Sequence, residues 1–311
     1  MNFSNITTKR QFRDCTAMDR HEFDQLCADA ESYYLEAHER SYEQYVLESV
    51  TEPPKFKHLS DALFFVLFQK KNDLVYGALG ATFDMDGSSA HLNYNKFNLL
   101  LEQVLEKKKV MPMREATDEK EFANHVSEAE ELLVDGTEMP IERPSDNDNQ
   151  RVMYSGKKKR HTDAAVVISD PQRYIYFVSQ LYEGSTVDIE VLRGEFTPGG
   201  NWFKDKTVSV DLGYVGVQKD YEFGTLHIGI KRPRRKKKTD PKIEFTEAQK
   251  AHNKAVSSRR IYVEHAIGEM KRYRVLINRS RIRCYRRKNH ELGICAGLAN
   301  YKNRLRRPVY E

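Results

Sequence analysis

The chain has few cysteines and no long apolar run. Its four cysteines form no CxxC pair and have no zinc-ligand spacing, so the pattern excludes a structural zinc site and is typical of reduced thiols in a reducing compartment. The longest apolar run, residues 62–68, is far too short to cross a bilayer, and we expect no membrane partner. The N-terminus lacks a charged start followed by an apolar stretch, so no secretion signal is expected.

A net charge of +5 conceals strong segregation of charge along the 311 residues. Residues 231–311 hold 25 Lys or Arg and 7 Asp or Glu, a net charge of +18, whereas residues 111–150 hold 3 and 12, a net charge of −9. The basic third is the natural place for a polyanion, with a solvated basic surface as the alternative. At 39% hydrophobic residues the chain can bury a core in one large domain or in two to three smaller ones.

The first 110 residues are predicted to be helical. Residues 1–54 form a helical segment rich in Glu, Tyr and Ala, for which we expect a role in oligomerisation or simple packing. Pro53 and Pro54 end this segment. Three helices are then predicted: from a cap at Ser60 and Asp61 to about Lys71, at Leu74–Phe83, and from a cap at Ser88 or Ser89 to about Leu105.

This order of three helices, with a short turn before the last, favours a helix-turn-helix DNA-binding domain over residues 55–110. A plain three-helix packing unit produces the same pattern, and the carboxylates of Asp84 and Asp86 would repel phosphate. Asp84 replaces the usual glycine of the turn but can still adopt a left-handed conformation. The candidate residues for reading the major groove are Ser88, Ser89, His91, Asn93, Asn95 and Lys96.

From residue 131 the pattern changes from helices to strands. Residues 111–130 are a charged linker, predicted to be partly helical, and residues 145–150 and 231–241 are predicted loops. We expect strands at Leu132–Met139, His161–Ser169, Tyr174–Leu181, Thr207–Val210 and Gly224–Lys231. Helices are expected at Val187–Glu195, capped by Ser185 or Thr186, and from Thr246 to about Tyr273. This order predicts a mixed α/β layer rather than a regular βαβ repeat.

Three acidic residues have the surroundings of a metal site. Asp135 and Asp211 each follow a short apolar, β-branched run, so we expect both at or near strand ends, while Glu264 lies in the long helical pattern. Hard divalent cations bind oxygen ligands, and Mg²⁺ takes only a few carboxylates and leaves room for water and phosphate. Aspartates after apolar strands cost desolvation unless positive charge meets them, which favours a metal site.

Around Glu264 the helix carries a mixed stripe of charge. Arg260, Glu264, Gly268 and Lys271 are spaced to share one face, where Gly268 would let a backbone or a phosphate approach closely. The carboxylate would hold a metal ion and the two cations would hold phosphate oxygens. Ordinary salt bridging on an exposed helix is the alternative, and it would be preferred for this helix if the two aspartates were absent.

Basic runs supply candidates for contact with the DNA backbone. Residues 157–161 follow a glycine and precede a strand, and a solvated loop is the alternative. Residues 231–238 also fit a polyanion site, and equally a nuclear import signal. The individual candidates are Lys157, Lys158, Lys159, Arg160, His161, Arg234, Arg235, Lys236 and Arg272.

Four segments together resemble the DDE-superfamily endonuclease domain of bacterial insertion-sequence transposases, a pattern that domesticated relatives of Harbinger-type elements share. They are residues 135–144, 154–162, the Asp-x-Gly-Tyr-x-Gly of 211–216, and 260–271. The resemblance covers about 131–305, and 59–105 look like the helix-turn-helix that often precedes this domain. It implies that residues 131–311 form an RNase H-like catalytic domain, a mixed sheet with flanking helices, preceded by an all-α region.

The resemblance also implies roles for individual residues. Asp135, Asp211 and Glu264 would bind two Mg²⁺ or Mn²⁺ ions, with Asp135 bridging both, and Arg260 and Lys271 would steady phosphate charge. Two positions depart from the family pattern. The aromatic position seven residues before Glu264 holds Ser257. The His-Asp often found after Gly-Ser in the family is replaced by Val-Asp at 187–188, so Asp188 is interpreted as only a helix-start residue.

The implied function is a DNA transposase that cleaves and joins insertion-sequence ends by metal-dependent hydrolysis and then transesterification. Its partners would be double-stranded DNA, comprising terminal inverted repeats and target DNA, and further copies of itself, as a homodimer or higher homo-oligomer in a synaptic complex. It would act in the cytoplasm, at the nucleoid, in a bacterium, or in the nucleus in a eukaryote. Two alternatives are a catalytically silent or domesticated DNA-binding protein and a metal-dependent nuclease without strand transfer.

Overall fold

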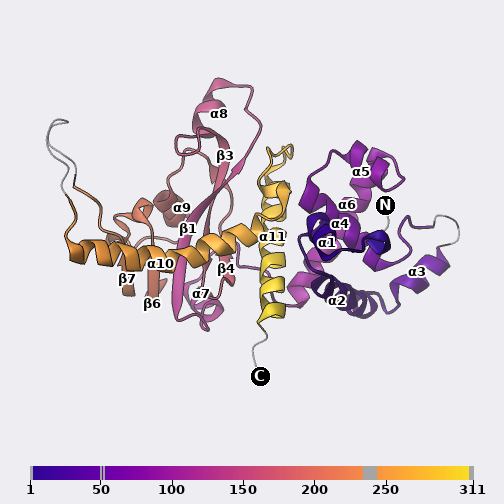
Figure 1. Ribbon diagram of the computed structural model, residues 1–311, viewed down its shortest axis with the longest axis horizontal. Helices are drawn as coiled ribbons and strands as arrows, with labels where there is room; N and C mark the ends of the chain where they lie inside the picture. Colours follow the sequence, from indigo (N-terminus) through magenta and orange to yellow (C-terminus); the bar gives the residue numbers. More distant parts are fainter. Residues whose placement is uncertain (1–2, 50, 52, 234–243, 308–311) are drawn as a thin grey trace. The chain divides into compact units, whose positions relative to one another are not determined.

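The computed structural model describes residues 3–49, 51, 53–233 and 244–307, and the chain divides into two compact units. The helical unit consists of residues 1–111, 270–280 and 290–311, and the sheet unit consists of 112–269 and 281–289 (Figure 1). The helical unit is therefore built from both ends of the sequence. The four-part division into 1–54, 55–110, 111–130 and 131–311 stays a prediction.

The helical unit contains the helices expected in the first 110 residues, and one that was not expected. Its elements are η1 (Phe3–Asn5), α1 (Lys9–Thr16), α2 (Arg20–His38), α3 (Tyr42–Glu48), α4 (Leu59–Asn72), α5 (Tyr76–Thr82), α6 (Gly87–Lys107) and η4 (Arg274–Leu276). The unexpected helix is α11 (Tyr285–Arg306), whose first residues belong to the sheet unit and whose remainder belongs to the helical unit.

The helix caps differ from those expected. His58, without a capping hydrogen bond, precedes α4, so Ser60 and Asp61 lie in its first turn rather than capping it. Asp86 caps α6 by accepting hydrogen bonds from the backbone N–H groups of Ser88 and Ser89, at 2.8 and 2.9 Å, so the predicted serine cap is wrong. A carboxylate is the stronger acceptor for the free N–H groups at a helix start. The left-handed conformation expected of residue 84 is confirmed, with φ of 54°.

The N-terminal segment belongs to the aromatic core of the helical unit. The ring of Phe23 in α2 lies 5.3 Å from that of Phe12 in α1 and 6.5 Å from that of Phe64 in α4, and all three side chains are buried. Burying a side chain of this size contributes roughly 1.5–3 kcal/mol. The segment therefore has a packing role, and its role in oligomerisation stays a prediction.

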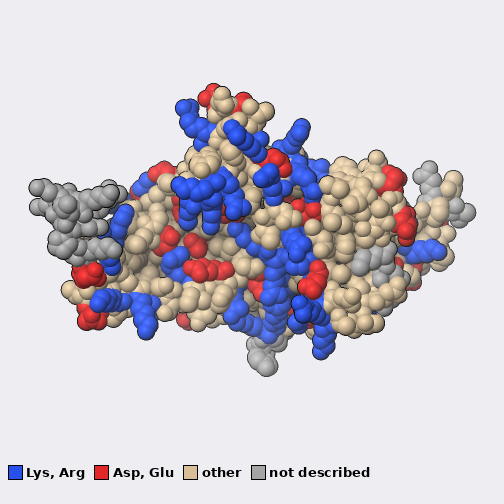
Figure 2. All heavy atoms as spheres, turned by 45° about the horizontal axis from the view of Figure 1, so that its top comes forward, with Lys and Arg blue, Asp and Glu red and all other residues tan. Residues whose placement is uncertain are grey.

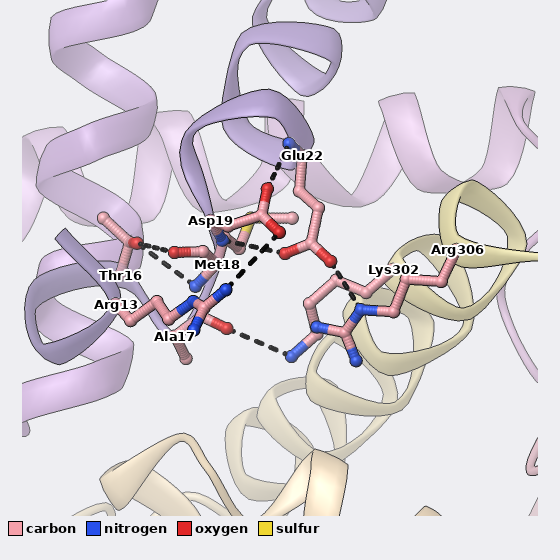
Figure 3. Close-up of polar contacts among 8 residues, drawn as sticks. All are labelled: Arg13, Thr16, Ala17, Met18, Asp19, Glu22, Lys302 and Arg306. Carbon is pink, nitrogen blue, oxygen red and sulfur yellow. Dashed lines mark hydrogen bonds and ion pairs between the residues drawn. The ribbon is translucent and has the colours of Figure 1, made fainter. Parts of the chain in front are cut away.

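Side chains from the last turns of α11 form hydrogen bonds with residues at and just before the start of α2 (Figure 3). Glu22, only 2% exposed, accepts a hydrogen bond from Nε of Arg306 at 2.7 Å with Oε1 and one from the backbone N–H of Asp19 at 2.8 Å with Oε2. Nζ of Lys302 donates to the carbonyl of Ala17 at 3.3 Å. Because a buried carboxylate is costly unless it is paired, Glu22 ties the C-terminal helix to the N-terminal one.

The sheet unit is a mixed sheet with flanking helices. Its strands are β1 (Glu131–Pro140), β2 (Tyr154–Ser155), β3 (Arg160–Ser169), β4 (Ile175–Val178), β5 (Tyr182–Glu183), β6 (Phe203–Val210) and β7 (Phe223–Ile228). The order is β2-β3-β1-β6-β7, and β4 and β5 also pair with β3. β1 is antiparallel to β3 and parallel to β6, and β7 is parallel to β6.

The helices of this unit are α7 (Glu119–His125), α8 (Asn147–Val152), α9 (Asp188–Glu195) and α10 (Glu247–Met270), with short turns η2 (Leu212–Tyr214) and η3 (Val217–Lys219). A mixed sheet with helices, after an all-α N-terminal region, confirms the expected α/β fold class and is consistent with an RNase H-like core. The core beneath the sheet is aromatic, with Phe122, Phe177, Phe196 and Phe203 all buried.

Two local expectations in this unit are corrected, and a third is largely untested. Residues 145–150 were expected to form a loop, but α8 begins there because Asp146 caps it, accepting from the backbone N–H of Asn149 at 2.8 Å. α9 begins after Val187 without a side-chain cap, so the predicted cap at Ser185 or Thr186 is wrong. Most of the predicted loop at 231–241 lies outside the described residues.

No helix in the described part of the chain combines the length and apolar character that crossing a membrane requires.

Candidate active site

Asp135 and Asp211 lie side by side because of the strand register. β1 and β6 run parallel, with Leu133 opposite Ser209, and continuing this register by two residues brings Asp135 beside Asp211. Asp211 directly follows β6, as expected. Asp135 lies inside β1 rather than at its end, because β1 continues to Pro140 by pairing with β3. Residues two apart share a face of a sheet, so both carboxylates project to the same side.

The third acid comes from α10, which crosses the sheet (Figure 1). Near its middle, Nη1 of Arg259 lies 3.2 Å from Oε1 of Glu131 at the start of β1. One residue later, Nη2 of Arg260 lies 3.6 Å from Oδ2 of Asp135, 3.8 Å from Oδ2 of Asp211 and 3.8 Å from Oε1 of Glu264. Three carboxylates from distant parts of the sequence therefore surround one guanidinium group.

The electrostatics of this cluster are governed by burial. Burial raises the pKa of Asp135 to about 6, the Arg260 guanidinium lowers this pKa in part, and the neighbouring carboxylate of Asp211 raises it further. The three distances to Arg260 exceed hydrogen-bond length, and its Nε is buried with no hydrogen-bond partner among the described residues. The guanidinium thus offsets the negative charge without fixing the carboxylates by hydrogen bonds.

The donor set fits a hard divalent cation, because it consists of carboxylate oxygens and includes one carboxyl whose pKa a nearby cation would lower. Among the described residues, no three His, Cys, Asp or Glu side chains are placed closely enough to hold an ion. The guanidinium of Arg260 instead supplies the positive charge, so a cation would have to displace it.

A fourth carboxylate, Asp188, lies at the same site. It begins α9, as expected. Its carboxylate also packs against two glycines. A Cβ atom added at Gly136 would lie 2.1 Å from Oδ1 of Asp188, and one added at Gly213 would lie 3.1 Å from Oδ2. Burial raises its pKa, the Lys157 ammonium lowers it and the Asp211 carboxylate raises it. The Val-Asp pair at 187–188 was the feature of the sequence that pointed to Asp188. The interpretation of Asp188 as only a helix-start residue was incomplete, because the residue also lies at the acidic site.

Tyr214 lies next to these acids and was not expected there. Its side chain is fully buried, and among the described residues its hydroxyl has no hydrogen-bond partner. The pKa of Tyr214 is raised well above its ordinary value, first by burial and then by the charges of Asp188, Asp135 and Asp211. A buried hydroxyl without a partner is costly, so the site holds an unused hydrogen-bonding group.

The predicted basic run forms the turn between β2 and β3, here called the basic turn (Lys157–Arg160). Two hydrogen bonds to Ser155 close the turn. The backbone N–H of Lys159 donates to the Ser155 carbonyl at 2.8 Å, and the backbone N–H of Lys158 donates to the Ser155 hydroxyl at 3.0 Å. Nζ of Lys157 lies 3.6 Å from Oδ2 of Asp188. Figure 2 shows Lys and Arg side chains gathered beside Asp and Glu side chains on this face of the sheet unit.

The other predicted site residues fall elsewhere. His161, in β3, packs its ring 5.6 Å from that of Tyr154. Lys271 and Arg272 follow the end of α10 and belong to the helical unit, so their role beside Glu264 stays a prediction. At Gly268 an added Cβ would meet nothing within 4 Å, so no described neighbour requires a glycine there. Arg234, Arg235 and Lys236 lie outside the described residues.

The predicted DNA-reading residues are all on α6. Ser88, Asn95 and Lys96 are exposed, and Ser89, His91 and Asn93 are partly buried. Nδ2 of Asn93 donates to the carbonyl of Ser89 at 2.9 Å, and Nζ of Lys96 lies 5.2 Å from the ring centre of Tyr45. Three of the six residues are therefore exposed on the surface of the helix.

Comparisons with known proteins identify the family of the chain. Residues 134–300 match the family described as DDE superfamily endonuclease. Over 188 residues the chain is 29% identical to the probable transposase for insertion sequence element IS702 of Microchaete diplosiphon, an alignment that covers 60% of this chain and 62% of that relative. No solved structure matches the chain. The family match includes the segments that carry all three acids.

Proposed function

Because this chain belongs to the DDE superfamily of endonucleases, we propose that it is a DNA transposase that cleaves insertion-sequence ends and joins them to target DNA. The observation that carries the proposal is the convergence of Asp135, Asp211 and Glu264 on the guanidinium of Arg260. The probable transposase that the chain resembles supports it. The reaction is metal-dependent phosphoryl transfer, first to water and then to a DNA 3′-hydroxyl.

Asp135, Asp211 and Glu264 would hold two Mg²⁺ or Mn²⁺ ions. When bound, such ions stabilise the attacking and leaving oxygens of an in-line displacement at phosphorus. The raised pKa of Asp135 means that this carboxyl gives up its proton as a cation approaches, so we expect cation binding to release protons near pH 6.

Arg260 has two successive tasks in this proposal. Before loading, its guanidinium offsets the charge of the acids at 3.6–3.8 Å. With cations bound at the acids, the guanidinium would be available to hold the non-bridging oxygens of the scissile phosphate, for which its planar fork of donors is suited. Its unpaired buried Nε supports this role, because one donor is already available.

DNA would be held at two places. The basic turn (Lys157–Arg160) would contact the backbone near the scissile phosphate, because it lies beside the acids through the ion pair of Lys157 with Asp188. In the helical unit, α4, α5 and α6 would form the helix-turn-helix, with Ser88, Asn95 and Lys96 on the accessible surface of the last helix. Because such chemistry usually acts on two DNA ends held together, the protein would work as at least a homodimer.

The test is nicking of element-end DNA by purified full-length protein in Mg²⁺ and in EDTA. Asp135→Asn and Glu264→Gln should reduce nicking to background while DNA binding persists. Asp205→Asn, an exposed carboxylate on β6, is the matched control and should nick at the wild-type rate. Nicking by Asp135→Asn at near the wild-type rate would refute the assignment of the acids.

A second assay separates transposase from the alternatives. A donor end with a free 3′-hydroxyl is incubated with supercoiled plasmid in Mg²⁺ or Mn²⁺. Joined products support the transposase, whereas degraded DNA alone indicates a nuclease without strand transfer. Binding of terminal-repeat DNA without cleavage in any divalent ion would indicate a silent DNA-binding protein.

A further inference from the structure

We propose that Asp188 is a positioning residue of the acidic site, joining the backbone segments that carry Asp135 and Asp211 and linking both to the basic turn. Its effect on catalysis rests on the proposed function. The proposal itself stands on the packing of one carboxylate between two glycines and on its ion pair with Lys157.

Two glycines lie against the Asp188 carboxylate. Gly136 directly follows Asp135, and Gly213 is two residues after Asp211. A Cβ at Gly136 would lie 2.1 Å from Oδ1 of Asp188, closer than real Cβ contacts occur, and one at Gly213 would lie 3.1 Å from Oδ2. Oδ2 lies 3.1 Å from the added Cβ at both positions, and at Gly213 the nearest atom is Oδ1 of Asp211, at 2.7 Å. The Asp188 carboxylate therefore lies close to the backbone beside Asp135 and to the backbone beside Asp211.

Asp188 has a defined position at the start of its own helix. It is the first residue of α9, which has no side-chain cap, and α9 packs against η2, the turn that follows Asp211. The positive end of the helix dipole stabilises a carboxylate at this position. A short helix that is anchored in the sheet unit by Ile189, Val191 and Leu192 thus delivers a fixed carboxylate between two backbone segments.

The Asp188 carboxylate is only weakly paired with positive charge. Asp188 forms an ion pair with Nζ of Lys157, at 3.6 Å from its Oδ2 and with the lysine side chain 61% exposed. Nearby, the fully buried hydroxyl of Tyr214 has no hydrogen-bond partner among the described residues, and Asp188 is the carboxylate with the largest electrostatic effect on it. A buried, unpartnered donor beside a weakly paired carboxylate indicates a site built to rearrange when it is loaded.

This geometry couples two binding events. A DNA phosphate that attracts Lys157 removes the counter-charge of Asp188, and the negative charge beside Asp135 and Asp211 then attracts a cation more strongly. Because coupling between two ligands is reciprocal, a divalent cation at the acids should in turn strengthen binding of phosphate at the basic turn. Removing the charge of Asp188 should weaken this coupling.

The packing is tested without any assay of activity, by a double-mutant cycle on the full chain. Gly136→Ala should lower the midpoint of urea unfolding in the wild-type background, because the new methyl group meets the Asp188 carboxylate. In an Asp188→Ala background the same substitution should have a much smaller effect. An equal effect in both backgrounds would overturn the proposal, because Asp188 would then not be the neighbour that Gly136 accommodates.

The functional part is tested by titrating Mn²⁺ into Asp188→Asn, which keeps the shape of the side chain and removes its charge. Loss of a positioning residue should weaken Mn²⁺ binding by about 10- to 100-fold. The Mg²⁺ concentration for half-maximal nicking should rise by a similar factor. Added oligonucleotide should strengthen Mn²⁺ binding to the wild type but not to this variant. Asp205→Asn is the control.

The outcomes separate the two proposals. Unchanged Mn²⁺ binding in Asp188→Asn, with wild-type coupling to DNA, would overturn the role of Asp188. If the wild-type protein itself neither binds Mn²⁺ nor nicks DNA, the proposed function fails. The unfolding cycle then still decides whether Asp188 positions the two acid-bearing segments.

Discussion

Nη2 of Arg260 lies 3.6 Å from Oδ2 of Asp135, an ion pair that joins α10 to the middle of β1. Asp135 is 12% exposed and Arg260 20% exposed in their side chains, so both charges are largely removed from water. Such a pair stabilises the fold mainly by preventing an unpaired buried charge. The guanidinium and a metal cation would therefore compete for the same carboxylates, which leads to the first prediction.

Arg260→Gln should bind Mn²⁺ more tightly than the wild type in the absence of DNA, because the competing positive charge is gone. The same variant should nick DNA more slowly, since the phosphate loses a bidentate donor. Titration calorimetry and a nicking assay on the same preparation measure both effects. Weaker Mn²⁺ binding in this variant would contradict the proposed competition.

The raised pKa of Asp135 predicts how stability depends on pH. Its ordinary value is 3.8 and its value in the fold is about 6, so the folded protein binds a proton more tightly than the unfolded chain. The free energy of unfolding therefore falls as pH rises through this window, and the penalty is fully present above about pH 6. The loss amounts to about 3 kcal/mol, at 1.36 kcal/mol for each pKa unit.

Asp135→Asn removes this penalty. In EDTA at pH 7 the variant should unfold at a higher urea concentration than the wild type. The difference should disappear at about pH 3, below the ordinary pKa of 3.8, where the wild-type carboxyl is protonated in both states. Urea unfolding at the two pH values is the measurement. An equal difference at both would show that the charge of Asp135 is not its cause.

A buried ion pair in the helical unit should also control stability. Nζ of Lys70, fully buried, lies 2.5 Å from Oε2 of Glu291, whose other oxygen accepts hydrogen bonds from Tyr94 and Asn98. Glu291→Gln leaves the Lys70 charge without its partner and should cost about 3–5 kcal/mol.

The matched control for that prediction is Glu48→Gln, which breaks an ion pair of Arg40 at the same N···O distance of 2.5 Å but with both side chains exposed. Its effect should stay within about 1 kcal/mol. Denaturant unfolding of both variants compares them directly, and similar losses would show that burial is not the deciding factor.

If α6 reads DNA, Lys96→Ala should weaken binding to terminal-repeat DNA and lower the slope of log affinity against log salt by about one. Lys9→Ala, an exposed lysine at the start of α1, should leave the slope unchanged. Fluorescence anisotropy over a range of salt concentrations measures this. An equal effect of the two substitutions would favour a plain three-helix packing unit.

The predictions from sequence succeeded where local patterns decide the structure. β-branched runs marked the long strands β1 and β3, and short apolar periods marked α4 to α6. Caps were misplaced at α4, α6 and α9. At α6 several polar residues stand near the helix start and the folded backbone selects Asp86, whereas α4 and α9 begin without a side-chain capping hydrogen bond. α11 was missed because residues 291–301 are buried on all sides, so no amphipathic period is present.

The candidate site was predictable only in part for a related reason. Asp135, Asp211 and Glu264 stand in motifs that resemble a family, so they could be named in advance. The contact of Asp188 with Gly136, and the buried hydroxyl of Tyr214, depend on how α9 and η2 approach β1 in space. Neither the spacing of residues in the sequence nor the composition predicts how these elements pack together.

The division of the helical unit between the two ends of the sequence affects synthesis. On the ribosome, residues 112–269 emerge before residues 290–306, which carry the partners of Glu22 and Lys70. Until residues 290–306 have emerged, Glu22 and Lys70 in the nascent N-terminal helices lack the ion-pair partners that they have in the folded chain. A prematurely terminated product would therefore keep its first hundred residues but lack the pairs that stabilise them, and it would be a ready substrate for proteolysis.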